Sequence, residues 1–127
     1  MKILIIGGTG TISSAITRQL AAAGHNLWLL NRGTRKDEVP ANVRQVIVDI
    51  DNTDEVLRLL GDEQFDAVCE FIGFLPSQVD RDIRLFRGRT RQYVFISSAS
   101  AYNKPATSHI ITEGTTLANP YWEYSRN

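Results

Sequence analysis

Five short runs rich in Ile, Leu, Val and Phe divide the chain at regular intervals. They lie at residues 3–6, 26–30, 43–48, 66–71 and 92–96. Short, mainly apolar runs of this kind are typical of strands that are buried on both faces of a sheet. We therefore expect five strands, the first of which begins almost at the amino terminus.

Apolar residues at helical spacing predict three helices between these strands. Their apolar positions are Ile12, Ala15, Ile16 and Leu20; Val56, Leu57 and Leu60; and Val79, Ile83 and Phe86. The expected amino-terminal caps are Asn52 or Thr53 for the second helix and Pro76 at the start of the third. The first helix should end near Ala23, and the expected stops are Gly24, Gly61 and Gly88. Residues 34–40 should form a loop, 103–120 show no clear period, and 121–127 look like the start of a helix.

Strands that alternate with helices predict an α/β fold with a parallel sheet and right-handed crossovers. We expect a doubly wound Rossmann fold with five strands in the order 3-2-1-4-5, and a ligand at the switch point between strands one and four. The candidate functional segments then all fall at the carboxyl ends of strands. They are residues 7–13, 31–32, 49–50, 71–73 and 97–102. At 127 residues, the chain is expected to form one domain, 1–127.

The segment 2–20, KILIIGGTGTISSAITRQL, has the strand, glycine turn and helix of a dinucleotide-binding loop. Gly7 suits the tight turn, and Gly10 leaves room for a pyrophosphate to approach the backbone. The first backbone N–H groups of the next helix, at Thr11, Ile12 and Ser13, can bind an anion there. Ser13 stands where a third glycine is usual; it is small enough for close packing, and its hydroxyl can reach a phosphate. The alternative is an ordinary strand-to-helix turn.

The second strand ends in Asn31-Arg32, and no carboxylate precedes Asp37. An NAD site usually has an acidic residue here to accept from the ribose 2′-hydroxyl, whereas Arg32 can hold a 2′-phosphate. Arg35 and Lys36 add positive charge, so the pattern favours NADP over NAD. The simplest alternative is a solvated basic loop that binds no cofactor.

The end of the third strand carries the next candidates, Asp49 and Ile50. The Asp49 carboxylate can accept from the adenine amino group, with Ile50 against the ring. Equally, Asp49 can cap the following turn. The residues leave the two readings open.

Composition restricts the classes of partner. The formal net charge is zero, which does not support a nucleic-acid or membrane surface. No apolar run approaches transmembrane length. The single cysteine, Cys69, excludes an intrachain disulfide and is typical of a reducing compartment, so we expect a cytoplasmic protein. Cys69 is expected to be a core residue. No cluster of residues suggests a metal site.

The glycine loop and the SSASAY segment together resemble the extended short-chain dehydrogenase/reductase superfamily, in its NAD-dependent epimerase/dehydratase group. GGTGTIS looks like the glycine motif of that group, with Ser13 as a departure found in atypical members. The run from Thr112-Glu113 to Tyr124 is similar to the stretch that leads to the family's catalytic tyrosine. The nearest group includes isoflavone reductase-like proteins and chloroplast stem-loop RNA-binding relatives.

The resemblance implies catalytic roles for Ser98, which would hydrogen-bond the substrate, and Tyr124, which would be the general acid/base. It places Ile72 and Gly73 beside the nicotinamide. The family lysine four residues after the tyrosine would fall at position 128, so we expect an inactive amino-terminal fragment of a longer enzyme. That enzyme would act on a nucleotide sugar or small carbonyl compound and could be a homo-oligomer. The alternative is a non-catalytic NADP-binding sensor or RNA-binding relative.

Overall fold

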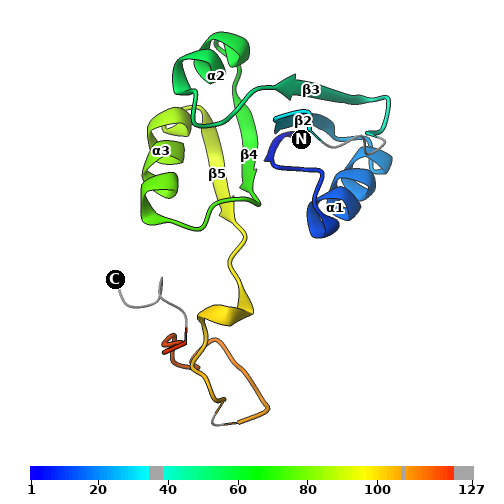
Figure 1. Cartoon of the computed structure of the whole chain (residues 1–127). Helices are drawn as coiled ribbons and strands as arrows, with labels where there is room; N and C mark the ends of the chain where they lie inside the picture. The colour runs from blue at the N-terminus through cyan, green and yellow to red at the C-terminus, as the bar shows by residue number, and fades with distance from the viewer. Residues whose placement is uncertain (35–38, 107, 122–127) are drawn as a thin grey trace. The chain divides into compact units, whose positions relative to one another are not determined.

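The computed structural model describes residues 1–34, 39–106 and 108–121, which form five strands, three α-helices and a short 3-10 helix (Figure 1). Their bounds are β1 Lys2–Ile6, α1 Thr11–Ala22, β2 Asn26–Asn31, β3 Val43–Ile47, α2 Thr53–Leu60, β4 Phe65–Glu70, α3 Pro76–Phe86, β5 Thr90–Phe95 and η1 Ala99–Ala101. The chain divides into two compact units, Met1–Ile96 and Ser97–Asn127. The first unit holds the whole sheet and the three α-helices.

The five strands form one sheet in the order β3-β2-β1-β4-β5, and every neighbouring pair is parallel. Leu4 of β1 lies opposite Trp28 of β2 on one side and Val68 of β4 on the other. The chain moves outward from β1 to β3 and then returns to the other side of β1 to form β4. This confirms the predicted fold class, strand order and switch point between β1 and β4.

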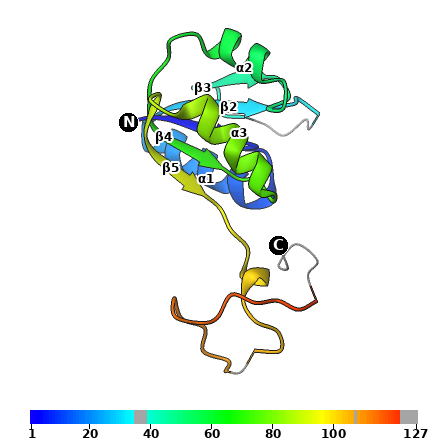
Figure 2. The same ribbon diagram turned by 90° about the vertical axis from the view of Figure 1, so that its left-hand side faces the viewer.

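Successive residues of the inner strands face opposite sides of the sheet and build two cores. Leu4, Ile6, Trp28 and Leu30 pack with residues of α2 and α3, namely Val56, Leu60, Leu85 and Phe86. Ile3, Ile5, Leu27 and Leu29 pack with Ala21 and Leu20 of α1 on the other side. Figure 2 shows α1 behind the sheet and α3 in front of it. Burial on both faces explains why these strands are apolar at consecutive positions.

The buried face of α1 differs from the predicted one. Ile12 is 63% exposed, while Ser13, Thr17 and Ala21 are buried. Thr17 Oγ1 donates to the Gly8 carbonyl oxygen at 3.3 Å, so the helix lies close to the glycine turn. Small side chains allow that approach, and the larger Ile12 is left outside the contact.

The predicted inward stripe of α3 was also wrong in part. Ile83 is 41% exposed, whereas Arg81 and Asp82 are buried beside Leu85 and Phe86. Charged residues are rarely buried unless they are paired, and these two pair with each other. The apolar spacing therefore predicted the wrong buried face for α3, because the true buried face includes an ion pair.

The boundaries of the other elements follow the prediction within a residue or two. Asn52 caps α2 by accepting from the Glu55 N–H, as expected. The helix expected at 121–127 falls almost entirely outside the described residues. No helix in the described part of the chain is long and apolar enough to cross a membrane.

Candidate functional site

The turn between β1 and α1 depends on two adjacent glycines. Gly7 has φ +98° and Gly8 has φ +23°, both in the region that favours glycine. A Cβ on Gly7 would lie 2.6 Å from Ile72 Cγ2, and one on Gly8 would lie 1.6 Å from Leu29 Cδ1. The role of Gly7 as the turn residue fits this geometry. The requirement for Gly8 was not foreseen, because it comes from the packing of Leu29 on the next strand.

Gly10 and Ser13 form the start of α1. Gly10 is the N-cap residue, with extended backbone at φ −83°, and a Cβ there would meet only Ser13 Oγ, at 3.3 Å. Ser13 is buried, and its Oγ accepts from the Gly10 N–H at 2.9 Å. The hydroxyl of Ser13 thus turns back onto the loop. A Cβ at Gly10 would therefore press on the Ser13 hydroxyl, and Gly10 itself lines the pocket described next.

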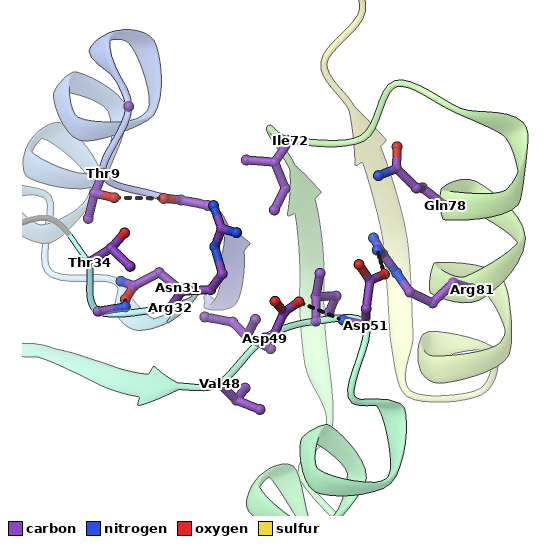
Figure 3. Close-up of a pocket in the computed structure, with 15 residues that line it drawn as sticks. Thr9, Asn31, Arg32, Thr34, Val48, Asp49, Asp51, Ile72, Gln78 and Arg81 are labelled. Carbon is purple, nitrogen blue, oxygen red and sulfur yellow. Dashed lines mark hydrogen bonds and ion pairs between the residues drawn. The ribbon is translucent and has the colours of Figure 1, made fainter.

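A pocket of about 350 Å³ opens at the carboxyl ends of the strands (Figure 3). It is lined by Gly7, Thr9, Gly10, Leu30, Asn31, Arg32, Gly33, Thr34, Val48, Asp49, Ile50, Asp51, Ile72, Gln78 and Arg81. Seven of the eleven cofactor-binding residues proposed from the sequence are among them. The other four, Thr11, Ile12, Ser13 and Gly73, are not part of this lining.

Asn31 and Arg32 form one wall of the pocket, at the end of β2. Asn31 Oδ1 accepts from the Gly33 N–H at 2.8 Å, which fixes the orientation of the amide. Asn31 Nδ2 is buried and has no hydrogen-bond partner among the residues that the structure describes. Arg32 is exposed, and Arg35 and Lys36, the other candidate cations, lie outside the described residues. A buried donor without an acceptor calls for an explanation, and an oxygen of a ligand or water in the pocket would supply one.

The loop after β3 brings Asp49, Ile50 and Asp51 into the pocket. Asp49 Oδ1 accepts from the Asp51 N–H at 3.0 Å, so the carboxylate does cap the local turn. Asp49 is exposed and Ile50 is only 4% exposed. This cap uses only one carboxylate oxygen of Asp49, and Asp49 still lines the pocket.

Ile72 and two residues of α3, Gln78 and Arg81, complete the lining. Figure 3 shows both α3 side chains pointing toward the pocket, across from Asn31, Arg32 and Thr34. The sequence did not predict Gln78 and Arg81, because the inward face of α3 was predicted from its apolar residues alone. The available signal was the Arg81-Asp82 pair, which precedes Leu85-Phe86 by one helical turn.

Glu70, at the end of β4, is a fully buried carboxyl group. Its Oε1 accepts from the backbone N–H groups of Ile72 and Gly73, at 2.9 Å for Gly73. Burial, and after it the neighbouring Asp82 carboxylate, raise the pKa of Glu70 to about 7, although the two backbone N–H groups act to lower it. Burial and the hydrogen bond to Asp82 likewise raise the pKa of the Tyr93 hydroxyl, which stays a proton donor.

The two residues with implied catalytic roles belong to the second unit. Ser98 is exposed and caps η1, because its Oγ accepts from the Ser100 N–H at 3.1 Å. Tyr124 lies outside the described residues. Within the described part of the chain, no group of three His, Cys, Asp or Glu residues could hold a metal ion. Burial raises the pKa of the Cys69 thiol, which argues against a nucleophilic role.

Residues 3–91 match the model of the NAD dependent epimerase/dehydratase family. A 2′-dehydrokanamycin reductase from Streptomyces kanamyceticus is 32% identical over 124 residues, covering 98% of this chain and 34% of that protein. A UDP-glucose 4-epimerase from Lactobacillus helveticus is 32% identical over 145 residues, covering 97% of this chain and 43% of that protein.

The fold is similar to that of a solved UDP-glucose 4-epimerase from Bifidobacterium longum, in complex with NAD+ and UDP. The TM-score is 0.74 at 19% identity, over 98% of this chain and 46% of that one. The chain thus spans less than half the length of these relatives.

Proposed function

The chain belongs to the NAD-dependent epimerase/dehydratase family, and from this premise we propose that residues 1–96 bind a nicotinamide dinucleotide in the pocket around Gly10. The observation that carries the proposal is the pocket itself. It joins the glycine turn, the end of β2 and the end of β3 at one edge of a doubly wound sheet, where such folds bind nucleotides.

The residues present fit a dinucleotide. The space in front of Gly10 and the amino terminus of α1 suit the pyrophosphate. The first turn of α1 has no acidic residue to oppose an anion. In this arrangement Asp49 and Ile50 hold the adenine, while Ile72 and the backbone at Gly73 lie toward the nicotinamide.

The end of β2 supports NADP as the preferred cofactor. In NAD sites a carboxylate usually accepts from the 2′-hydroxyl here. Asn31 instead has its oxygen bonded to the Gly33 N–H, and its buried amide nitrogen is a donor with no acceptor among the residues that the structure describes. A donor beside the Arg32 cation suits the oxygens of a 2′-phosphate.

For the whole protein we propose an epimerase, dehydratase or reductase that acts on a nucleotide sugar or a small carbonyl compound. The family and the two relatives above support this range. The bound cofactor supplies hydride transfer, Ser98 hydrogen-bonds the substrate oxygen, and Tyr124 transfers the proton. The alternative is a non-catalytic NADP-binding sensor or an RNA-binding relative. Turnover of a carbonyl panel that is lost in Ser98→Ala and Tyr124→Phe supports the enzyme, and binding without turnover by the whole protein supports the sensor.

The binding test uses Gly10→Val. The isopropyl group fills the space where the pyrophosphate must approach the backbone, so titration calorimetry should detect no NADP or NAD binding. Gly10 has ordinary extended backbone, so the variant should fold if the Ser13 hydroxyl, 3.3 Å from the new Cβ, shifts slightly; circular dichroism checks this.

Ala22→Val is the matched control, because it places the same isopropyl group at an exposed position at the other end of α1. It should bind like the wild type. Equal affinity in Gly10→Val and the wild type would refute the placement of the dinucleotide.

A further inference from the structure

A cluster of three buried charged side chains and one half-buried tyrosine lies beside the pocket. It consists of Glu70, Arg81, Asp82 and Tyr93, and we call it the α3 cluster. Glu70 and Asp82 are 0% exposed and Arg81 is 5% exposed. Such charges are costly to bury, so a buried ion cluster is weak support for stability by itself. Its contacts show what else it does.

The Arg81 guanidinium is held in one orientation. Its Nε donates to Asp82 Oδ1 at 2.9 Å, and its Nη2 forms an ion pair with the same oxygen at 2.8 Å. The second oxygen of Asp82 accepts from the Tyr93 hydroxyl at 2.7 Å, which ties the carboxylate to β5. Because Tyr93 holds Asp82, and Arg81 also contacts Asp51 and Glu70, the planar guanidinium has little freedom to turn.

Arg81 reaches out of the cluster to the loop after β3. Its Nη1 donates to Asp51 Oδ1 at 2.5 Å. The Asp51 N–H in turn donates to Asp49 Oδ1 at 3.0 Å. Both contacts can be followed in Figure 3. Asp49 and Ile50 line the pocket, so α3 is linked by hydrogen bonds to its adenine side.

The opposite wall is linked to the same cluster. Glu70 Oε1 accepts from the N–H groups of Ile72 and Gly73. Gly73 is packed so closely that a Cβ would lie 3.1 Å from Phe95 and 3.2 Å from Glu70 Cγ. Arg81 Nη2 lies 3.5 Å from Glu70 Oε2. The cluster thus contacts the loops on both sides of the switch point.

We propose that Arg81 is a positioning residue for the dinucleotide pocket, acting through Asp51 to hold Asp49 and Ile50 in place while Glu70 holds Ile72. This inference rests on the proposed binding function. It differs from a direct ligand contact, because the guanidinium is already engaged by its carboxylate partners and acts through the loop.

The test measures NAD and NADP affinity by calorimetry in four variants. Asp51→Ala and Arg81→Lys should each weaken binding about tenfold, the effect of one charged hydrogen bond. The double variant should be no weaker than the weaker single variant, because both remove the same link. Asp51→Glu keeps the carboxylate and should restore affinity.

Two features keep this test interpretable. The Asp51 side chain is 71% exposed, so Asp51→Ala should fold even if Arg81→Lys does not. Arg58→Met is the matched control: it breaks the Arg58–Glu55 pair, which has contacts of 2.6 and 2.7 Å at an exposed position outside the pocket lining. It should leave affinity unchanged.

Additive losses would overturn the proposal, since Asp51 and Arg81 would then act separately on the ligand. Wild-type affinity in Asp51→Ala would overturn it as well. If the wild type binds neither dinucleotide, the proposed function fails, but positioning is still tested without ligand. In that case Arg81→Lys should shift the amide NMR signals of Asp49, Asp51 and Asn52, and Arg58→Met should not; unchanged signals in Arg81→Lys would refute it.

Discussion

At the scale of single residues, our proposal makes Arg32 and Asn31 responsible for which ribose the end of β2 accepts. Arg32→Ala should weaken NADP binding by about 1.5–3 kcal/mol more than NAD binding, because a charge-assisted contact is lost only for the phosphorylated ribose. Calorimetric titration with both cofactors measures the difference. Arg18→Ala removes an exposed cation from α1 and should affect neither. A similar loss for both cofactors in Arg32→Ala would mean that Arg32 supplies only general positive charge.

Gly8 makes a second prediction at this scale. Alanine at Gly8 places its Cβ 1.6 Å from Leu29, a fully buried residue. We expect Gly8→Ala to lower the free energy of unfolding by about 2–4 kcal/mol, from overpacking and backbone strain together. Gly24→Ala is the control, since it has φ +78° but nothing within 4 Å, and it should cost only about 1 kcal/mol. Urea unfolding measures both, and equal losses would show that the contact with Leu29 relaxes easily.

At the scale of elements, the junction of β4 and α3 should make stability depend on pH through Glu70. The pKa of Glu70 is about 7 in the folded chain against 4.5 for the free side chain. Between these values the folded state holds more protons than the unfolded state, so stability falls as pH rises through this window. Glu70→Gln mimics the protonated carboxyl and should remove that fall, as urea unfolding at a series of pH values will measure.

Glu55 provides a control, because its pKa is shifted in the opposite direction to that of Glu70. The hydrogen bond from Arg58 lowers the pKa of this exposed carboxyl, so any contribution it makes is lost as pH falls. Glu55→Gln should therefore leave the fall of stability toward neutral pH in place. Parallel pH profiles for the wild type and Glu70→Gln would contradict the assignment of that fall to Glu70.

Helix faces were harder to predict than helix positions. The glycines and Asn52 placed the ends of the helices because caps and stops act locally. The faces of α1 and α3 depend instead on what lies across from them. Thr17 is buried because the glycine turn is close, and Arg81 is buried because Glu70, Asp51 and Asp82 surround it. Apart from the adjacent Asp82, these partners come from segments farther away along the chain, so periodicity could not reveal them.

For the whole molecule, the strand order followed from the alternation of elements and the handedness of their crossovers. The site could be predicted from the sequence in part, because the carboxyl ends of parallel strands meet at one edge of the sheet. Asn31, Asp49 and Ile72 were found by that rule. Gln78 and Arg81 were not found by it, since they lie on α3, the helix after β4, and not at the end of a strand.

The division of the chain into two units predicts where binding resides. Every residue that lines the pocket, and every residue of both cores, lies within Met1–Ile96. A chain that ends after Ile96 should therefore unfold cooperatively and bind the dinucleotide within about threefold of the 127-residue chain.

A chain that ends after Arg89 lacks β5, which pairs with β4 and carries the Tyr93 hydroxyl bonded to Asp82. It exposes the edge of β4 and should lose cooperative unfolding. Circular dichroism melting and calorimetry distinguish the cases, and loss of binding in the chain ending after Ile96 would show that the second unit contributes to the pocket.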